Sequence, residues 1–279
     1  MSWIITGTQK NKGLLDEFSG AAAAYSLRDL SLLRNAPVVR VRRDNDDAEQ
    51  DFTATEVSDG TLAAWVGAGN NGFVRTWYDQ SGNSSDVTQS SYGLQPQIVD
   101  NGSVITENSK PAIYYNDNLL GSTGLIDVTQ DLSMFTVISP QTNPATQDGA
   151  WGQFSSELNS LYNYVAYGFR SGGYFTRIQT TPTTVVANGF DTTSQSQSLV
   201  SDVVKWSTLT NTFTVNGIVG NDPNLGRSTT SVVSIALGAR PVADDFTYIN
   251  LQEVVLYPSD QSANRAAIEA NINAHYSIF

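Results

Sequence analysis

The sequence lacks cysteine entirely and holds one histidine, His275, among its 279 residues. Without cysteine there can be no disulfide bond, no thiol nucleophile and no cysteine-ligated metal. With a single histidine, neither Ser-His-Asp catalysis nor a histidine-ligated metal centre is expected. No cofactor or metal is therefore predicted, and His275 is expected to pack or to cap the end of a helix.

Positive charge and long apolar runs are also scarce. The chain has 15 Lys and Arg against 27 Asp and Glu, a net charge of −12. No basic stripe exists, so nucleic acid is not an expected partner. No run approaches the length of a membrane span, and the N-terminus lacks a secretory apolar core, so neither membrane insertion nor a signal peptide is predicted. The simplest expectation is a protein that folds in a cytoplasm and leaves it, if at all, by lysis.

Short apolar-alternating runs separated by Gly, Asn, Asp and Pro fill most of the chain. Such runs at this spacing predict a β-sandwich or jelly roll. Asn216-Gly217, between two of the runs, is a strong signal for a hairpin turn. The predicted strands are "APVVRVRR", "FVRTWYD", "KPAIYYN", "LSMFTVIS", "YVAYGF", "YFTRIQT", "VVKWSTLT", "TFTVNGI", "VVSIALG" and "YINLQEVVLY".

Three segments predict helices. Residues 19–35, behind Ser19, place the apolar side chains of Ala23, Leu27, Leu30 and Leu33 on one face of a helix. Residues 61–66 show helical spacing before a glycine-rich end. After Pro258, with Ser259 as the expected cap, isoleucines and a tyrosine recur every four residues. The predicted fold is all-β: a single jelly-roll sandwich over residues 19–279 with a helix near each end, preceded by an extension over residues 1–18.

The stretch "WYDQSGN", residues 77–83, admits two interpretations. Its aromatic, carboxylate and amide groups suit a sugar site, where a ring stacks on the sugar and polar groups bind hydroxyls. The same residues suit a tight turn, in which a carboxylate accepts from backbone N–H groups, Gly82 supplies a positive φ and Asn83 adopts the left-handed region. The composition favours the turn. The glycan-binding candidates here are Trp77, Tyr78, Asp79, Gln80 and Asn83.

A second aromatic region and a charged region carry further alternatives. Tyr164, Tyr167 and Tyr174 could form a glycan platform or a protein interface, and the sequence does not separate the two. The arginines of "RVRR", residues 40–43, precede an acidic run over residues 44–51. Pairing between these charges is favoured over binding of a phosphate or acidic sugar. A solvated loop is favoured over a Ca²⁺ site, since the run lacks EF-hand spacing.

Three stretches resemble a known family. They are "AAAAYSLRDLSLLRNAPVVRVRRDNDDAEQDF", "GNNGFVRTWYDQSGNSSDVTQ" and "INLQEVVLYPSDQSANRAAIEANINAHY". Together they look like the catalytic domain of α-L-arabinofuranosidase B, a sandwich of the concanavalin A-like lectin/glucanase class. Similar modules also occur in bacteriophage structural and tail proteins. The resemblance implies the fold, whereas hydrolysis requires the catalytic residues themselves.

The catalytic carboxylates that the resemblance implies do not match this sequence. A retaining glycosidase needs a nucleophile and an acid/base. The family's nucleophile is a glutamate in the middle of the domain, yet no Asp or Glu lies between Glu157 and Asp191. The family's acid/base aspartate aligns with Val242, and Asp244 and Asp245 lie out of register. No catalytic residue is therefore predicted.

The sequence as a whole predicts a non-enzymatic bacteriophage virion protein, a head decoration or a tail fibre component. Lectin-like attachment to host-surface glycans is its candidate activity, and other virion proteins and copies of itself are its expected partners. The alternatives are an arabinofuranosidase-type hydrolase and a soluble lectin. Trp3, Ile4 and Ile5, apolar residues of the N-terminal extension, are the assembly candidates.

Overall fold

The structure is a computed structural model that describes eleven segments of the chain. It describes only the backbone path, and not the side chains, for residues 126–127, for the strands within residues 149–191 and for residues 232–234. The described residues are 12–122, 126–127, 130–141, 149–155, 164–170, 173–179, 184–191, 196–208, 210–220, 232–238 and 248–279.

Strands dominate the described chain. The helices are α1 (Leu14–Glu17), α2 (Ala54–Ser58), α3 (Thr61–Val66) and α4 (Arg265–Tyr276), with a 3₁₀ turn at Tyr92–Leu94. The strands are β1 (Ala23–Ser26), β2 (Val39–Arg43), β3 (Glu49–Phe52), β4 (Gly72–Trp77), β5 (Val87–Thr88), β6 (Gln97–Asp100), β7 (Ser103–Val104), β8 (Thr106–Glu107), β9 (Lys110–Pro111), β10 (Ile113–Asn116), β11 (Leu120–Ser122), β12 (Ile126–Asp127), β13 (Leu132–Pro140), β14 (Gly149–Ser155), β15 (Tyr164–Arg170), β16 (Gly173–Gln179), β17 (Thr184–Asp191), β18 (Ser198–Lys205), β19 (Thr210–Val215), β20 (Ile218–Val219), β21 (Val232–Leu237) and β22 (Tyr248–Tyr257).

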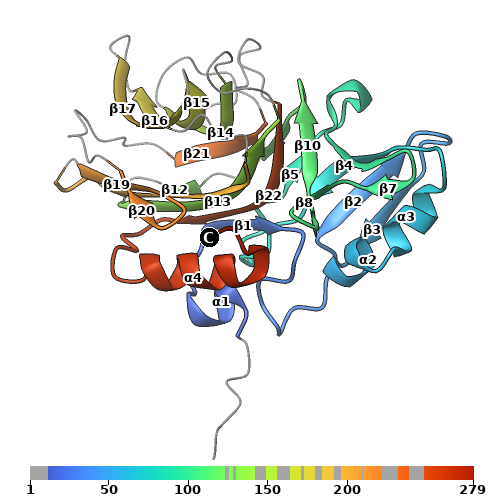
Figure 1. The fold of residues 1–279 in the computed structure, drawn as a ribbon, viewed down its shortest axis with the longest axis horizontal. Helices are drawn as coiled ribbons and strands as arrows, with labels where there is room; N and C mark the ends of the chain where they lie inside the picture. The colour runs from blue at the N-terminus through green and yellow to red at the C-terminus, as the bar shows by residue number, and fades with distance from the viewer. Residues whose placement is uncertain are drawn as a thin grey trace, which may run out of the picture.

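The strands build a sandwich around β22. One edge of β22 pairs antiparallel with β1 and then β10, and the other edge pairs with β13, which continues through β18 to β19 and β20. The facing layer runs from β11 through β21 to β14, β15, β16 and β17. Figure 1 shows this second layer above the first, with α4 beneath and a lobe of β2, β3, β4, α2 and α3 to one side. The predicted all-β sandwich is confirmed.

Both faces of β13 and β22 are covered, which explains why nearly every position in them is buried. On β22, Val254 and Leu256 join the core between the two layers, whereas Val255 joins a second cluster beneath the sheet. Helix α4 supplies Ile268 and Ile272 to that second cluster. The sheet is thus the middle of three layers, and α4 is part of the packed structure.

The helix predicted over residues 19–35 is wrong. Residues 23–26 form strand β1, with Ala24 opposite Val255, and all four β1 residues are buried. The small alanine side chains let β1 lie between the sandwich core and the layer that contains α4, so burial overrides the helix propensity of alanine. Leu33, predicted on the buried face of that helix, is 90% exposed.

The other two predicted helices are confirmed, and one of them begins later in the chain than predicted. Helix α3 occupies residues 61–66 as predicted. Helix α4 begins at Arg265, and its N-cap position is occupied by Asn264, five residues after the expected cap at Ser259. The backbone carbonyl of Ser259 instead accepts a 2.8 Å hydrogen bond from the hydroxyl of Ser133 at the start of β13. Within the described residues no helix is both long enough and apolar enough to cross a membrane.

The described part of the N-terminal extension packs against the sandwich. Leu14 of α1 is fully buried in the second cluster. The backbone N–H of Leu15 donates to the carbonyl of Leu30 at 2.8 Å, and the Tyr257 hydroxyl donates to the carbonyl of Phe18 at 2.8 Å. The assembly candidates Trp3, Ile4 and Ile5 lie outside the described residues.

Candidate functional site

The turn that follows β4 is held by the carboxylate of Asp79, which is 5% exposed. One oxygen accepts from the backbone N–H groups of Ala24 at 2.8 Å and Ser81 at 2.9 Å. The other accepts from the Ser81 hydroxyl at 2.7 Å and the Ser85 N–H at 3.1 Å. Four donors therefore converge on one buried carboxylate, and one of them comes from β1, far away in the sequence.

Two amide side chains extend this anchoring. The Gln80 side chain accepts a hydrogen bond from the backbone N–H of Leu30 and donates to the backbone carbonyls of Ser26 and Arg28, each at 2.9 Å. Asn83 donates to the backbone carbonyls of Ala21 and Ala22 at 2.9 and 3.1 Å. The turn thus fixes the path of residues 21–30, the segment in which the sequence predicted a helix.

Backbone geometry in the turn differs in one detail from the expectation. Gly82 has the predicted positive φ, +92°. The second left-handed residue is Ser84, with φ +57°, rather than Asn83. Asn83 is free of that role, and its side chain instead bonds the Ala21–Ala22 segment.

Trp77 faces the core and has no exposed surface. Strict alternation along β4 would put it on the same side as Phe73 and Arg75. A bulge in the pairing with β2, where Arg40 opposes Thr76 but Val41 opposes Val74, shifts the register at Arg75 and turns Trp77 inward. Its ring offers no face to a ligand.

The outer side of the same turn borders a pocket of about 460 Å³. Tyr78 is half-buried on its wall, and its hydroxyl donates to the Asp51 carboxylate at 2.7 Å. Burial and that hydrogen bond raise the pKa of Tyr78 to about 12, so its hydroxyl stays protonated and uncharged at physiological pH. We call this hollow the turn pocket; it is lined by Ser31, Leu33, Arg34, Tyr78, Asp79, Gln80, Ser81, Gly82, Ser84 and Asp86.

Two charged groups of the turn pocket keep unused hydrogen-bonding capacity. Asp86 accepts from the backbone N–H of Asp79 at 2.8 Å through one oxygen. Burial raises the pKa of Asp86, and the charge of Arg34 partly opposes that rise. Arg34 donates to the carbonyl of Pro37 at 3.3 Å, but its buried Nη1 has no partner in the described part of the chain. A carboxylate and a guanidinium of this kind can together bind a neighbouring donor and acceptor.

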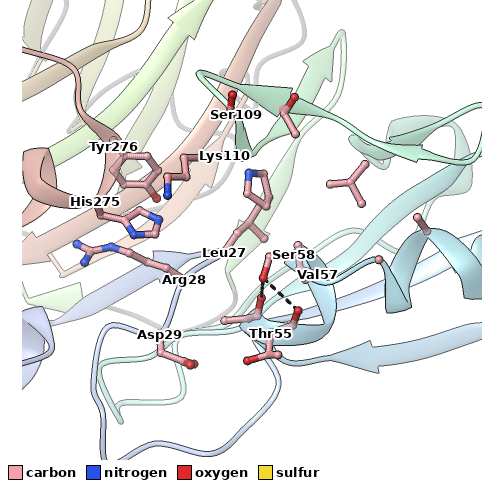
Figure 2. A pocket seen from close by; sticks show the side chains of 16 residues that line it. Leu27, Arg28, Asp29, Thr55, Val57, Ser58, Ser109, Lys110, His275 and Tyr276 are labelled. Carbon is pink, nitrogen blue, oxygen red and sulfur yellow. Dashed lines mark hydrogen bonds between the residues drawn. The ribbon is translucent and has the colours of Figure 1, made fainter.

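A second hollow of about 520 Å³ lies where α2, α3, the β8–β9 hairpin and the end of α4 meet (Figure 2). We call it the helix pocket. Leu27, Arg28 and Asp29 pass along it, Thr55 and Ser58 come from α2, and Lys110 from β9. Sequence analysis missed this pocket, because its lining residues come from four separate segments of the chain.

A buried ion pair supports one wall of the helix pocket. Glu253 of β22 is fully buried and accepts from Arg28 Nε at 2.7 Å and Nη2 at 2.9 Å. The hydroxyls of Ser26 and Tyr276 also donate to it, at 2.9 and 3.2 Å. Next to this group, burial and the charge of Arg28 lower the pKa of His275 to about 4, so the imidazole is neutral at physiological pH.

The predicted charge pairing on the β2–β3 hairpin is confirmed. Arg40, Arg42 and Arg43 contact Asp51, Asp47 and Asp46 at 2.8, 2.7 and 2.7 Å. No group of three metal-ligating side chains occurs within the described segments.

For Tyr164, Tyr167 and Tyr174 the structure describes only the backbone. Tyr164 and Tyr167 lie on β15, and Tyr174 lies on the neighbouring β16, where it pairs with Phe169. Glu157, Val242, Asp244 and Asp245, which bear on the missing catalytic carboxylates, lie outside the described residues.

Comparisons with known proteins identify the fold. No protein-family model and no curated protein matches the chain. A crystal structure of arabinofuranosidase complexed with arabinofuranosyl-α-1,2-xylobiose aligns over 91% of this chain, with 15% identity and a TM-score of 0.66. The ligand-binding domain of botulinum neurotoxin serotype D, in complex with N-acetylneuraminic acid, aligns over 87% of this chain and 50% of its own, with 10% identity and a TM-score of 0.51. This chain spans 62% of the arabinofuranosidase chain. At these identities the likeness shows that the chain has the β-sandwich fold of these proteins.

Proposed function

We propose that the protein binds carbohydrate at the turn pocket without hydrolysing it. The observation that carries the proposal is that Asp86 and Arg34, both with unused hydrogen-bonding capacity, line the same pocket as the ring of Tyr78. Adjacent hydroxyls of a sugar can donate to a carboxylate and accept from a guanidinium at the same time. The apolar face of the sugar can pack on an aromatic ring.

The structural neighbours support the same ligand class. Two of them are complexes with carbohydrate, one with arabinofuranosyl-α-1,2-xylobiose and the other with N-acetylneuraminic acid. These two sugars are therefore the first probes for this chain. A pocket of about 460 Å³ falls in the range of roughly 300–1,000 Å³ that is typical of small-molecule sites.

Binding without hydrolysis fits the state of the two carboxylates at the turn pocket. A glycosidase of either stereochemistry needs a pair, one of which attacks or activates water while the other protonates the leaving group. Asp79 already accepts four hydrogen bonds that hold the turn, so it is committed to structure. The 33 residues between Glu157 and Asp191, where the family's nucleophile is expected, contain no carboxylate.

A glycan array followed by titration calorimetry tests the proposal. We expect the wild-type chain to bind at least one array glycan, and Asp86→Asn and Arg34→Gln each to weaken binding about tenfold or more, the effect of losing a hydrogen bond to a charged group. Asp46→Asn, on the exposed β2–β3 hairpin, is the matched control and should bind like wild type. Binding unaffected by both pocket variants would refute the proposed site.

We further propose that this binding takes place on a bacteriophage virion, as part of a head decoration or a tail fibre assembled in the host cytoplasm. The resemblance of the sequence to modules of phage structural proteins supports this placement. Other virion proteins, copies of this chain and host-surface glycans would then be its partners. Mass spectrometry of purified particles, with antibody labelling under the electron microscope, tests it. Absence of the chain from particles made by a strain that expresses it would contradict the placement.

A further inference from the structure

The helix pocket contains one basic group that the fold does not neutralise. Lys110, on β9, has no hydrogen bond or ion pair to its ammonium group in the described part of the chain. Glu107 lies directly opposite it in the β8–β9 hairpin. The Glu107 carboxylate, however, accepts from the side-chain amide of Asn250 at 3.0 Å and forms no ion pair with Lys110. Lys110 therefore presents a positive charge at the pocket in a chain of net charge −12.

The wall around Lys110 favours an anion. Figure 2 shows Lys110, His275 and Arg28 together on one side of the pocket. The charge of Arg28 is matched by Glu253 through two short hydrogen bonds, which leaves Lys110 as the cation of this wall without an ion-pair partner in the described part of the chain. The positive charges of Arg28 and Lys110 both act, after burial, to keep His275 neutral. A negative group placed here would therefore be attracted to Lys110 and could also accept a hydrogen bond from the N–H of the neutral imidazole.

Other polar groups of the lining can bind hydroxyl groups. Asp29 borders the pocket, and burial raises its pKa although Arg34 acts against that rise. The Ser58 hydroxyl donates to the carbonyl of Ala54 at 2.9 Å, so its oxygen remains able to accept. Leu27 and Val57, both buried, supply an apolar surface between these polar edges. The ligand that this arrangement fits has an anionic group at one end and hydroxyls at the other.

We infer that the helix pocket binds an acidic sugar, with the carboxylate of the sugar at Lys110 and its hydroxyls toward Asp29 and Ser58. The volume of about 520 Å³ accommodates a ligand of this size. The inference concerns a site separate from the turn pocket. It uses none of the turn pocket's lining residues, so either site can be present without the other.

A matched pair of sugars isolates the charge. Galacturonic acid and galactose differ by a carboxylate in place of a hydroxymethyl group, and titration calorimetry on the full chain compares them at pH 7. We expect galacturonate to bind at least about tenfold more tightly than galactose, as expected for one hydrogen bond to a charged group. Lys110→Gln should reduce galacturonate binding to the level of galactose, and Lys110→Arg should retain most of it.

Two controls make the outcome specific. Lys205→Gln removes a lysine that pairs with Asp260 at 2.9 Å, outside the pocket, and should leave galacturonate binding unchanged. Asp86→Asn should also leave it unchanged, which separates this site from the turn pocket. Equal binding of the two sugars, no galacturonate binding up to its solubility limit, or full binding by a folded Lys110→Gln variant would each overturn the inference.

Discussion

Ion pairs of equal length serve different purposes in two regions of the molecule. On the β2–β3 hairpin, Arg43 and Asp46 lie 2.7 Å apart with side chains 26% and 46% exposed. Beneath the helix pocket, Arg28 and Glu253 also lie 2.7 Å apart, but their side chains are 14% and 0% exposed. Water screens the first pair, whereas the carboxylate of the second has no exposed surface. Burial, and not distance, therefore decides which carboxylates the fold depends on.

The largest effect is expected at Glu253. Glu253→Gln leaves the charge of Arg28 buried without its partner, which costs about 3–5 kcal/mol of the free energy of unfolding. Urea unfolding followed by circular dichroism measures this loss. The double variant Arg28→Met with Glu253→Gln removes both charges and should recover part of the lost stability. A single variant as stable as wild type would show that this pair is not structurally important.

The next effect is expected at Asp79. Asp79→Ala leaves four donors at the turn without their acceptor, which costs about 1–3 kcal/mol. Because the donors include the N–H of Ala24, hydrogen exchange should also accelerate in β1. Unchanged exchange in β1 together with wild-type stability would contradict the structural role of this carboxylate.

A smaller and pH-dependent effect is expected at His275. Its pKa in the folded protein, about 4, lies below the ordinary 6.5, because burial and Arg28 disfavour the charged form. The unfolded chain therefore takes up a proton first as the pH falls, and stability is lost between about pH 6.5 and pH 4. His275→Asn removes this loss. The melting temperature of the variant relative to wild type should rise from pH 7 to pH 5, and a constant difference would refute the shift.

The smallest effect is expected on the hairpin. Asp51→Asn weakens an ion pair with Arg40 that is 42% and 34% exposed and keeps an acceptor for the Tyr78 hydroxyl. The expected loss is about 0–1 kcal/mol, and it should shrink as salt screens the pair. Thermal melts in low and high salt measure it. A loss as large as that of Glu253→Gln would erase the contrast between the two regions.

Local pattern predicted the elements that are stabilised locally. Strand β22 has the predicted bounds, Tyr248–Tyr257. Asn216 and Gly217 form the expected hairpin turn between β19 and β20, with φ values of +51° and +75°. The charge pairs of the β2–β3 hairpin also follow from neighbouring residues, because their partners are at most eleven positions apart.

The features that the sequence did not predict depend on packing between segments that are far apart in the chain. The alanines of β1 form a strand because β22, more than 200 residues later, pairs with them, and no local signal carries that partner. The bulge at Arg75 reversed the expected orientation of Trp77. Arg34 and Asp86 of the turn pocket, and Lys110 and His275 of the helix pocket, come together only through the folded chain. The sequence could therefore predict a candidate site at the turn, but it could not predict that Arg34 and Asp86 line the pocket on the outer side of that turn.

The most direct test of the two faces of the turn compares Asp79→Ala with Asp86→Asn in one experiment that records melting temperature and glycan binding. Asp86→Asn keeps the acceptor for the backbone N–H of Asp79 and removes a carboxylate whose pKa is raised by burial. We predict that Asp79→Ala lowers the melting temperature, while Asp86→Asn keeps it and loses glycan binding. A stable Asp79→Ala variant that has lost binding, beside an Asp86→Asn variant that still binds, would contradict this assignment of the inner face to folding and the outer face to the ligand.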